Sequence, residues 1–159
     1  MQKLISLDDH IFIAGGNGMV GSSLQKILKN AGYGDTSRGG KLLTPTRKEL
    51  NLLNFNDVLN WYERFKPNVV IIAAGKVGGI NANAKFPADF ILENLKIQTN
   101  LIELAWKTDV KRLLFLGSSC IYPKFSKQPI KEDYLLANSL EPTNECYAIS
   151  KIAGIKLCE

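Results

Sequence analysis

The segment IFIAGGNGMVG, residues 11–21, passes from four apolar residues into a run rich in glycine. The uninterrupted apolar run Ile11–Ala14 is typical of a strand that is covered on both faces in a parallel sheet. Glycine then recurs at every third position from Gly15 to Gly21, and a helical pattern over residues 19–31 follows. A strand, a glycine turn and a helix in this order predict the first unit of an α/β fold.

The same alternation continues along the rest of the chain. The expected strands are residues 11–14, 41–44, 69–73 and 113–116, and the expected helices are residues 19–31, 55–65, 89–108 and 142–159. Like residues 11–14, the apolar runs 69–73 and 113–116 show no alternation, so we expect these strands also to be covered on both faces. Residues 30–41 are polar and rich in glycine, which predicts a surface loop. We therefore predict a doubly wound parallel α/β sheet of the Rossmann type.

The composition is that of an ordinary folded protein. With 159 residues, 45% of them hydrophobic and 22% charged, the chain is long enough for one domain. The net charge is +5 and the isoelectric point about 9.1, but the 20 Lys and Arg residues are scattered along the chain. This distribution argues against a nucleic-acid-binding protein and favours a surface that tolerates phosphate-bearing ligands.

The cysteines and the single histidine do not form a metal-binding pattern. Cys120, Cys146 and Cys158 are odd in number and lack metal-ligand spacing, and His10 stands alone at the start of the first strand, where we expect a surface residue. No apolar run reaches the length of a membrane span, and the N-terminus does not resemble a signal peptide. We expect a cytoplasmic protein with reduced thiols and no metal.

The glycine turn has the features of a dinucleotide-binding site. A backbone without Cβ atoms can approach a pyrophosphate closely and present the N–H groups of the next helix to it. The alternative is a tight turn with no ligand, but the order of strand, glycines and helix favours a cofactor site. The candidate residues are Gly15, Gly16, Asn17, Gly18, Met19, Val20 and Gly21.

The end of the second strand indicates which cofactor is bound. An NAD site usually has Asp or Glu there, to accept hydrogen bonds from the adenosine ribose. This chain instead has Arg47 and Lys48, and its first acid at that point is Glu49. A guanidinium can bind a 2′-phosphate through paired hydrogen bonds, whereas the alternative is a solvated basic residue at the start of a helix. We predict NADP, with Arg47 as the 2′-phosphate ligand.

Tyr147 and Lys151 lie four residues apart on the last expected helix, and therefore on one face of it. A nearby cation is expected to lower the pKa of the tyrosine, which can then exchange a proton with a carbonyl oxygen. Tyr and Lys at this spacing are also common on half-exposed helices. Ser118 and Ser119 end the last strand, where open α/β sheets bind ligands, and a hydroxyl there can hydrogen-bond the same carbonyl.

Four segments carry a resemblance to a known family: AAGKVGGINAN (73–83), FPADFILEN (86–94), LLFLGSSCIYPK (113–124) and EPTNECYAISKIAGIKLCE (141–159). Together with the glycine turn they resemble the extended short-chain dehydrogenase/reductases. Within that family, they are similar to the enzymes that epimerise a nucleotide-linked keto-sugar and then reduce it with NADPH. The resemblance implies a nucleotide-sugar substrate and covers nearly the whole chain, with residues 30–41 matching least.

The resemblance also implies roles for individual residues. Tyr147 matches the proton donor in the reduction, Lys151 the residue that also holds the nicotinamide ribose, and Ser118 the hydroxyl that binds the carbonyl. Cys120 matches the acid/base thiol of the epimerisation, although most unpaired cysteines are only small buried apolar residues. The cofactor match extends to Ala73, Ala74, Leu116, Gly117, Ser118 and Ser119. Cys146 departs from the pattern, because a proline is common there.

Members of the family have about twice this length. The resemblance therefore implies that residues 1–159 are the cofactor-binding half, without the remaining strands and the C-terminal substrate lobe. It places the second acid/base of the epimerisation, a histidine, in that missing part, and His10 cannot replace it. We expect little or no turnover from these 159 residues alone.

Two other functions and an oligomeric state follow from the same residues. The alternatives are another nucleotide-sugar epimerase, dehydratase or reductase of the superfamily, and a non-catalytic dinucleotide-binding module.

Residues 89–108 carry two apolar sets, one with Ile91 and Ile102 and one with Leu101 and Leu104. If one set faces the sheet, the other is available for a homodimer, and replacing Leu101 and Leu104 by Lys should give a monomer.

Overall fold

The computed structural model describes residues 4–159. The strands are β1 (His10–Ala14), β2 (Lys41–Leu43), β3 (Val69–Ile72) and β4 (Arg112–Phe115). The helices are α1 (Met19–Asn30), α2 (Phe55–Phe65), α3 (Ile80–Lys85), α4 (Pro87–Lys107) and α5 (Glu145–Cys158). Three short 3₁₀ helices are η1 (Thr36–Arg38), η2 (Ser119–Ile121) and η3 (Glu132–Tyr134).

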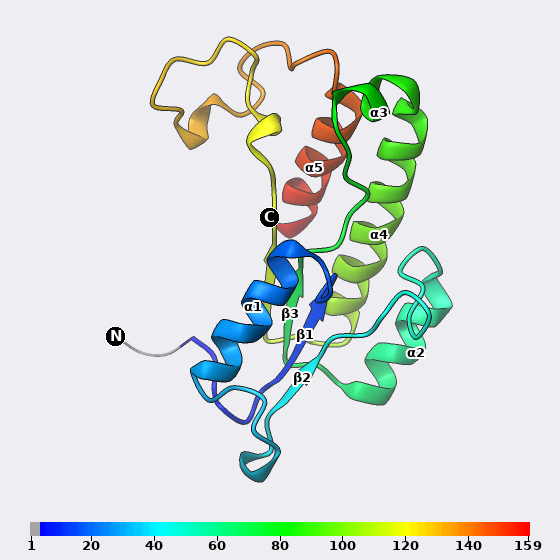
Figure 1. The fold of residues 1–159 in the computed structure, drawn as a ribbon, viewed down its shortest axis with the longest axis vertical. Coiled ribbons are helices and arrows are strands. Elements are labelled where there is room, and N and C mark those ends of the chain that lie inside the picture. The colour runs from blue at the N-terminus through cyan, green and yellow to red at the C-terminus, as the bar shows by residue number, and fades with distance from the viewer. Residues whose placement is uncertain (1–3) are drawn as a thin grey trace. The chain divides into compact units, whose positions relative to one another are not determined.

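The four strands form one parallel sheet in the order β2-β1-β3-β4 (Figure 1). In the register of the two central strands, Ile11 lies beside Val69 and Ala14 beside Ile72. Chain order and spatial order differ because each strand is joined to the next by a helical crossover. The predicted doubly wound parallel fold is confirmed, with each strand within one residue of its expected limits.

The chain divides into two compact units, which we describe separately. The sheet unit contains the described residues up to Ala74 and the segment Ile97–Leu116, and therefore all four strands. The helical unit contains Gly75–Lys96 and Gly117–Glu159, and therefore α3, η2, η3 and α5. Helix α4 contributes its first part to the helical unit and its second part to the sheet unit.

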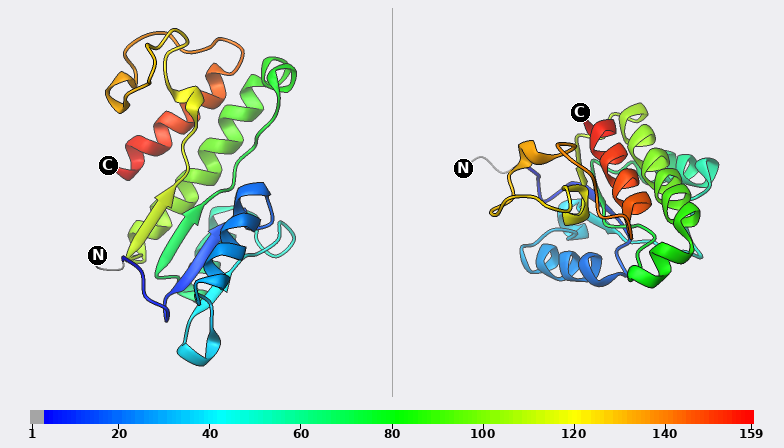
Figure 2. Two further views of the ribbon diagram at one scale, coloured as in Figure 1. Left: turned by 60° about the vertical axis from the view of Figure 1, so that its left-hand side comes forward. Right: turned by 90° about the horizontal axis from the view of Figure 1, so that it is seen from above.

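Helices cover both faces of the sheet. On one face, Ile11, Ile13 and Val69 pack against apolar side chains that include Leu24 and Leu28 of α1. On the other face lie helices α2 and α4 (Figure 2), whose apolar side chains pack against the strands. The members of this second, larger cluster are Phe12, Ala14, Leu50, Val58, Tyr62, Val70, Ile72, Leu101, Ile102, Leu104 and Ala105. Strands β1 and β3 are thus buried on both faces, as their sequences predict.

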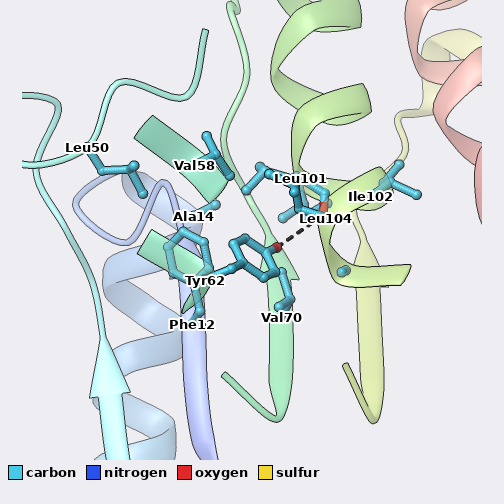
Figure 3. Close-up of a cluster of buried hydrophobic side chains, with 11 residues drawn as sticks. Phe12, Ala14, Leu50, Val58, Tyr62, Val70, Leu101, Ile102 and Leu104 are labelled. Carbon is cyan, nitrogen blue, oxygen red and sulfur yellow. Dashed lines mark hydrogen bonds between the residues drawn. The ribbon is translucent and has the colours of Figure 1, made fainter. Parts of the chain in front are cut away.

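Tyr62 joins the two helices of the larger cluster. Its ring is buried beside Phe12, and its hydroxyl donates a hydrogen bond of 3.0 Å to the backbone oxygen of Leu101 (Figure 3). Burial raises the pKa of Tyr62, because the charged phenolate would lose its hydration. The hydroxyl therefore stays protonated and serves as a structural donor between α2 and α4.

Two expectations about burial are wrong. Strand β4 is covered on one face only: Leu113 and Phe115 pack against the larger cluster, whereas Leu114 is 49% exposed. In the second part of α4, residues of both apolar sets enter the core of the sheet unit, since Leu101 and Leu104 are 0% exposed and Ile102 is also buried. The first two are therefore not available for a dimer interface, because side chains of α2 cover the set that was expected to remain free.

The structure also changes the limits of the helical elements. Helix α5 begins at Glu145 and not at Pro142, because Thr143 and Asn144 form a turn whose N–H groups donate to Glu141. Helix α3 was not expected; Asn83 fixes its first turn by donating to the backbone oxygens of Gly78 and Gly79. The glycine-rich loop over residues 30–41 contains η1, which Asp35 caps.

None of the described helices combines the length and the apolar character that crossing a membrane requires.

Candidate active site

The glycine turn joins β1 to α1 and depends on two of its glycines. Gly15 has φ +82°, and a Cβ atom there would lie 2.7 Å from the backbone nitrogen of Ala74. A Cβ atom on Gly21 would lie 2.2 Å from the backbone oxygen of Gly15. Any larger residue would separate the helix from the turn, so the sequence pattern sets how closely strand and helix approach.

The N-terminus of α1 is open. Its N-cap is Gly18, which has no side chain to accept hydrogen bonds from the first N–H groups of the helix. Asn17, Met19 and Val20 are exposed. The Gln25 side chain stabilises the turn by donating a hydrogen bond of 2.8 Å to the backbone oxygen of Gly16. Free N–H groups at a helix N-terminus bind phosphate, and a Cβ-free turn beside them leaves room for a pyrophosphate.

In the turn after β2, the arginine side chain is exposed and the carboxylate of Glu49 is hydrogen-bonded within the turn. Arg47 is exposed in this turn. The Glu49 carboxylate accepts hydrogen bonds from the backbone nitrogen and the hydroxyl of Thr46, at 2.7 and 2.8 Å, and these bonds lower the pKa of Glu49. Glu49 is therefore engaged in its own turn, and the exposed basic residues Arg47 and Lys48 stand where an NAD site usually has an acid, which fits the predicted preference for NADP.

The remaining cofactor candidates of the sheet unit lie at the carboxyl ends of the strands. The N–H of Ala73 donates to the oxygen of Ala14, so the sheet pairing continues one residue past β3 and meets the glycine turn. Leu116 likewise donates to the oxygen of Ile72. The structure thus brings Ala73, Ala74 and Leu116 to the same edge as Gly15.

The four catalytic candidates belong to the helical unit. Ser118 is the N-cap of η2, and its hydroxyl oxygen accepts a hydrogen bond of 3.3 Å from the backbone nitrogen of Cys120. Helix α5 carries Tyr147 and Lys151 on one face, and the Lys151 Nζ atom lies 6.0 Å from the centroid of the Tyr147 ring. Ser119 is exposed on η2. The hydroxyls, the thiol and the ammonium that the sequence singled out therefore stand on two adjoining elements, η2 and α5.

The electrostatics of Tyr147 differ from the expectation. Burial raises its pKa, a hydrogen bond with Ser118 lowers it, and the charge of the Cys120 thiolate raises it. The net direction is upward, whereas proximity to Lys151 was expected to lower it. Lys151 is itself only 5% exposed, and burial lowers its pKa, since an ammonium is poorly solvated there. The chain by itself thus keeps Tyr147 in its protonated form, as a proton donor requires.

A buried amide that the sequence interpretation missed organises the loop of residues 75–79. Asn94 is 2% exposed; its Oδ1 atom accepts from the backbone nitrogen of Lys76, and its Nδ2 atom donates to the oxygens of Lys76 and Phe90. A Cβ atom on Gly75 would lie 2.9 Å from the same Oδ1 atom and 3.8 Å from the Lys151 Nζ atom. Asn94 thus holds this loop beside Lys151. The sequence does contain a signal for this role, because Asn94 is a polar residue at the end of the segment FILEN in a helix rich in apolar residues.

A second missed residue contacts the thiol. The Asn144 Nδ2 atom donates a hydrogen bond of 3.2 Å to the Cys120 Sγ atom, across 24 residues of sequence. Nothing in the local pattern of EPTNECY pairs this asparagine with the thiol. Cys146, the departure from the family pattern, lies two residues further on and lines a hollow of about 300 Å³ with Asn83, Pro87 and Asn144.

Two further observations concern possible binding sites elsewhere in the molecule. A hollow of about 330 Å³ in the sheet unit is lined by residues such as Lys66, Asn68 and Asp109, at the amino ends of β3 and β4 and so at the opposite edge from the glycine turn. Within residues 4–159, no three His, Cys, Asp or Glu side chains come together in a way that would hold a metal ion.

The parallel sheet, with the glycine turn after its first strand, defines a Rossmann-type α/β protein. The model of the NAD dependent epimerase/dehydratase family matches residues 11–159, and the chain belongs to this family. Among curated relatives, it is 54% identical over 149 residues to GDP-L-fucose synthase 1 of Arabidopsis thaliana and 52% identical over 149 residues to GDP-L-fucose synthase of Escherichia coli K12. The resemblance read from the four sequence segments is confirmed.

A solved structure agrees with these sequence matches. GDP-mannoheptose C4 reductase from Campylobacter jejuni, solved with NADP bound, superimposes with a TM-score of 0.90 at 37% identity, over 98% of this chain and 47% of that one. The two curated relatives are each matched over 94% of this chain and 44% of their own length. The chain therefore spans less than half the length of the relatives it matches.

Proposed function

We propose that the protein to which this chain belongs converts GDP-4-keto-6-deoxy-D-mannose into GDP-L-fucose. The reaction is a 3,5-epimerisation followed by an NADPH-dependent reduction at carbon 4. One observation supports it most: a thiol, Cys120, stands with Ser118 and the Tyr147–Lys151 pair on two adjoining elements of the helical unit. A simple 4-epimerase has no need of an acid/base thiol there.

The glycine turn and the turn after β2 fit an NADP molecule. The open N-terminus of α1 is suited to the pyrophosphate, and Arg47 to the 2′-phosphate. NADPH would supply the hydride for the carbonyl carbon when bound. The residues proposed to contact it are Gly15, Gly16, Asn17, Gly18, Met19, Val20, Gly21, Arg47, Ala73, Ala74, Leu116, Gly117, Ser118, Ser119 and Lys151.

In the reduction, the proton for the carbonyl oxygen comes from Tyr147. Burial keeps this hydroxyl protonated at neutral pH, and its hydrogen bond with Ser118 places the two hydroxyls beside one another, where both can donate to one oxygen. Lys151 holds a positive charge close to the ring and so stabilises the phenolate that remains after the transfer. Each of the three groups thus acts on the same oxygen or on its proton.

In the epimerisation, Cys120 exchanges protons at the carbons on either side of the carbonyl. A base removes the proton from such a carbon, the electrons move onto the carbonyl oxygen as an enolate, and an acid returns a proton to the opposite face of the carbon. A thiol can serve in either direction, since its pKa is not extreme. We propose that its partner acid/base, a histidine in the family pattern, lies outside these 159 residues, so that these residues alone have little or no turnover.

The proposal extends to assembly and location. We propose a cytoplasmic homodimer, in keeping with three cysteines that form no disulfide among the described residues. Ile149 and Leu157 of α5 are exposed apolar residues of the helical unit that such an interface can use. Light scattering on the purified protein would show a single mass of two chains, and a monomer at all concentrations would remove the idea.

Product analysis tests the proposed reaction. Full-length protein is incubated with NADPH and GDP-4-keto-6-deoxy-D-mannose, and in parallel with keto-sugars linked to other nucleotides. We expect GDP-L-fucose from the first mixture, with one NADPH oxidised for each product. Turnover only with another nucleotide-sugar would indicate a different member of the superfamily. Tight NADPH binding without turnover of any of them would indicate a non-catalytic dinucleotide-binding module.

A further inference from the structure

Asn144 occupies the N-cap position of α5 without capping the helix. Its side chain accepts no hydrogen bond from the first turn of α5. Asn54 at the N-cap of α2 behaves as this position usually does, since its Oδ1 atom accepts from the backbone nitrogens of Asn56 and Asp57 at 2.9 and 3.2 Å. The two asparagines thus share a position and differ in what the side chain contacts.

The amide of Asn144 is directed at sulfur instead. Its Nδ2 atom lies 3.2 Å from the Cys120 Sγ atom, while its Oδ1 atom is buried and has no hydrogen-bond partner among the described residues. An uncapped helix and a buried acceptor without a donor both lower stability. A contact that is kept at the expense of stability points to a role in function.

The contact completes the positioning of the thiol. Ser118 accepts from the backbone nitrogen of Cys120, which fixes the backbone of η2, and Asn144 fixes the side chain. An N–H group that donates a hydrogen bond to sulfur stabilises the thiolate, and the thiolate is the form that accepts a proton from carbon. On α5, the titratable groups that bear on this thiol are Tyr147, which interacts with its charge, and Lys151, which lies over the Tyr147 ring.

We propose that Asn144 is a positioning residue for Cys120, donating to the sulfur and holding it in the orientation from which it exchanges protons with the substrate. The inference deepens the proposed function and rests on it for the role of the thiol. The hydrogen bond itself can be tested without any substrate.

The test compares Asn144→Asp and Asn144→Ala with the parent protein, and uses Asn54→Ala as the matched control at an N-cap that does cap. Alkylation of Cys120 by iodoacetamide is followed against pH in the full-length protein by peptide mass spectrometry, which resolves it from Cys146 and Cys158. Because Asp keeps the shape of Asn but can only accept a hydrogen bond, it should hold the proton on sulfur. We expect both Asn144 variants to slow alkylation at neutral pH by about fivefold and to move its rise to higher pH.

The control separates positioning from capping. Asn54→Ala should leave the alkylation of Cys120 unchanged and lower the Tm more than Asn144→Ala does, because only Asn54 caps its helix. Unchanged rates and pH profiles in both Asn144 variants would overturn the inference. If neither variant folds, the Asn144 side-chain amide resonance of the parent decides: it should shift on alkylation of Cys120 while that of Asn54 does not, and an unmoved resonance contradicts the contact.

The inference and the proposed function fail in different ways. If Cys120→Ser leaves epimerisation intact, the proposed role of the thiol is wrong whatever the Asn144 variants do. If Cys120→Ser abolishes proton exchange at the sugar but the Asn144 variants exchange at the parental rate, only the positioning role of Asn144 is wrong.

Discussion

The Nζ atom of Lys151 lies 6.0 Å from the centroid of the Tyr147 ring, one turn further along α5. Burial moves the pKa values of the two groups in opposite directions, raising that of Tyr147 and lowering that of Lys151. Both shifts favour the neutral forms, because a buried charge loses its hydration. Burial therefore sets the direction of the Tyr147 pKa shift, and the polar neighbours Ser118 and Cys120 adjust it.

Two variants should move the pKa of Tyr147 in opposite directions. The hydrogen bond from Ser118 lowers this pKa and the Cys120 thiolate raises it. Ser118→Ala removes the lowering contact, so the pKa should rise further, and Cys120→Ser removes the negative charge, so the pKa should fall. Carbon NMR of labelled tyrosine, with the Tyr147 signal assigned from Tyr147→Phe, follows each titration. Shifts of the same sign in both variants would contradict this description of the site.

Arg47→Ala should weaken NADPH far more than NADH. The Arg47 guanidinium is exposed after β2 together with Lys48, while the Glu49 carboxylate accepts a hydrogen bond from Thr46. Loss of a bidentate phosphate contact should weaken NADPH binding by about tenfold or more and leave NADH within a factor of about two. Fluorescence titration with each cofactor measures this, with Arg64→Ala on α2 as a charge-matched control. An equal loss for both cofactors would mean that Arg47 does not contact the 2′-phosphate.

Leu101→Ala should destabilise the protein, and Leu92→Ala should not. Both residues lie on α4, but Leu101 is 0% exposed in the larger core cluster and Leu92 is 53% exposed. The cavity left at Leu101 should cost about 2–5 kcal/mol of unfolding free energy. The change at Leu92 should stay within about 0.5 kcal/mol. Urea unfolding monitored by circular dichroism gives both values. Equal losses would mean that α4 does not bury Leu101 in the core.

The strands and the glycine turn could be predicted because their signals are local. An uninterrupted apolar run marks β1 and β3, and the pattern of glycines reports contacts within a few residues, such as that between Gly15 and Gly21. Helix α2 has the predicted limits, and the structure shows that Asn54, directly before it, caps its first turn. Ser118 and Tyr147 were also predicted from local signals, namely the short segments that resemble the extended short-chain dehydrogenase/reductases.

The interactions that could not be predicted join residues that are far apart in the sequence. Asn144 reaches Cys120 across 24 residues, and Tyr62 reaches Leu101 across 39. The burial of Leu101 and Leu104 in α4 has the same origin, since it depends on side chains of α2 that periodicity within α4 does not reveal. The direction of the Tyr147 pKa shift was missed because burial is its largest cause, and burial is a property of the folded chain.

The central claim is that two residues of one site divide two reactions between them. The most direct measurement follows, in the same full-length samples, the uptake of solvent deuterium at carbons 3 and 5 of GDP-4-keto-6-deoxy-D-mannose and the oxidation of NADPH. We predict that Cys120→Ser slows deuterium uptake by at least about 100-fold, and that Tyr147→Phe keeps the uptake but slows NADPH oxidation by at least about 100-fold. Equal and small effects of the two substitutions on both rates would contradict the assignment.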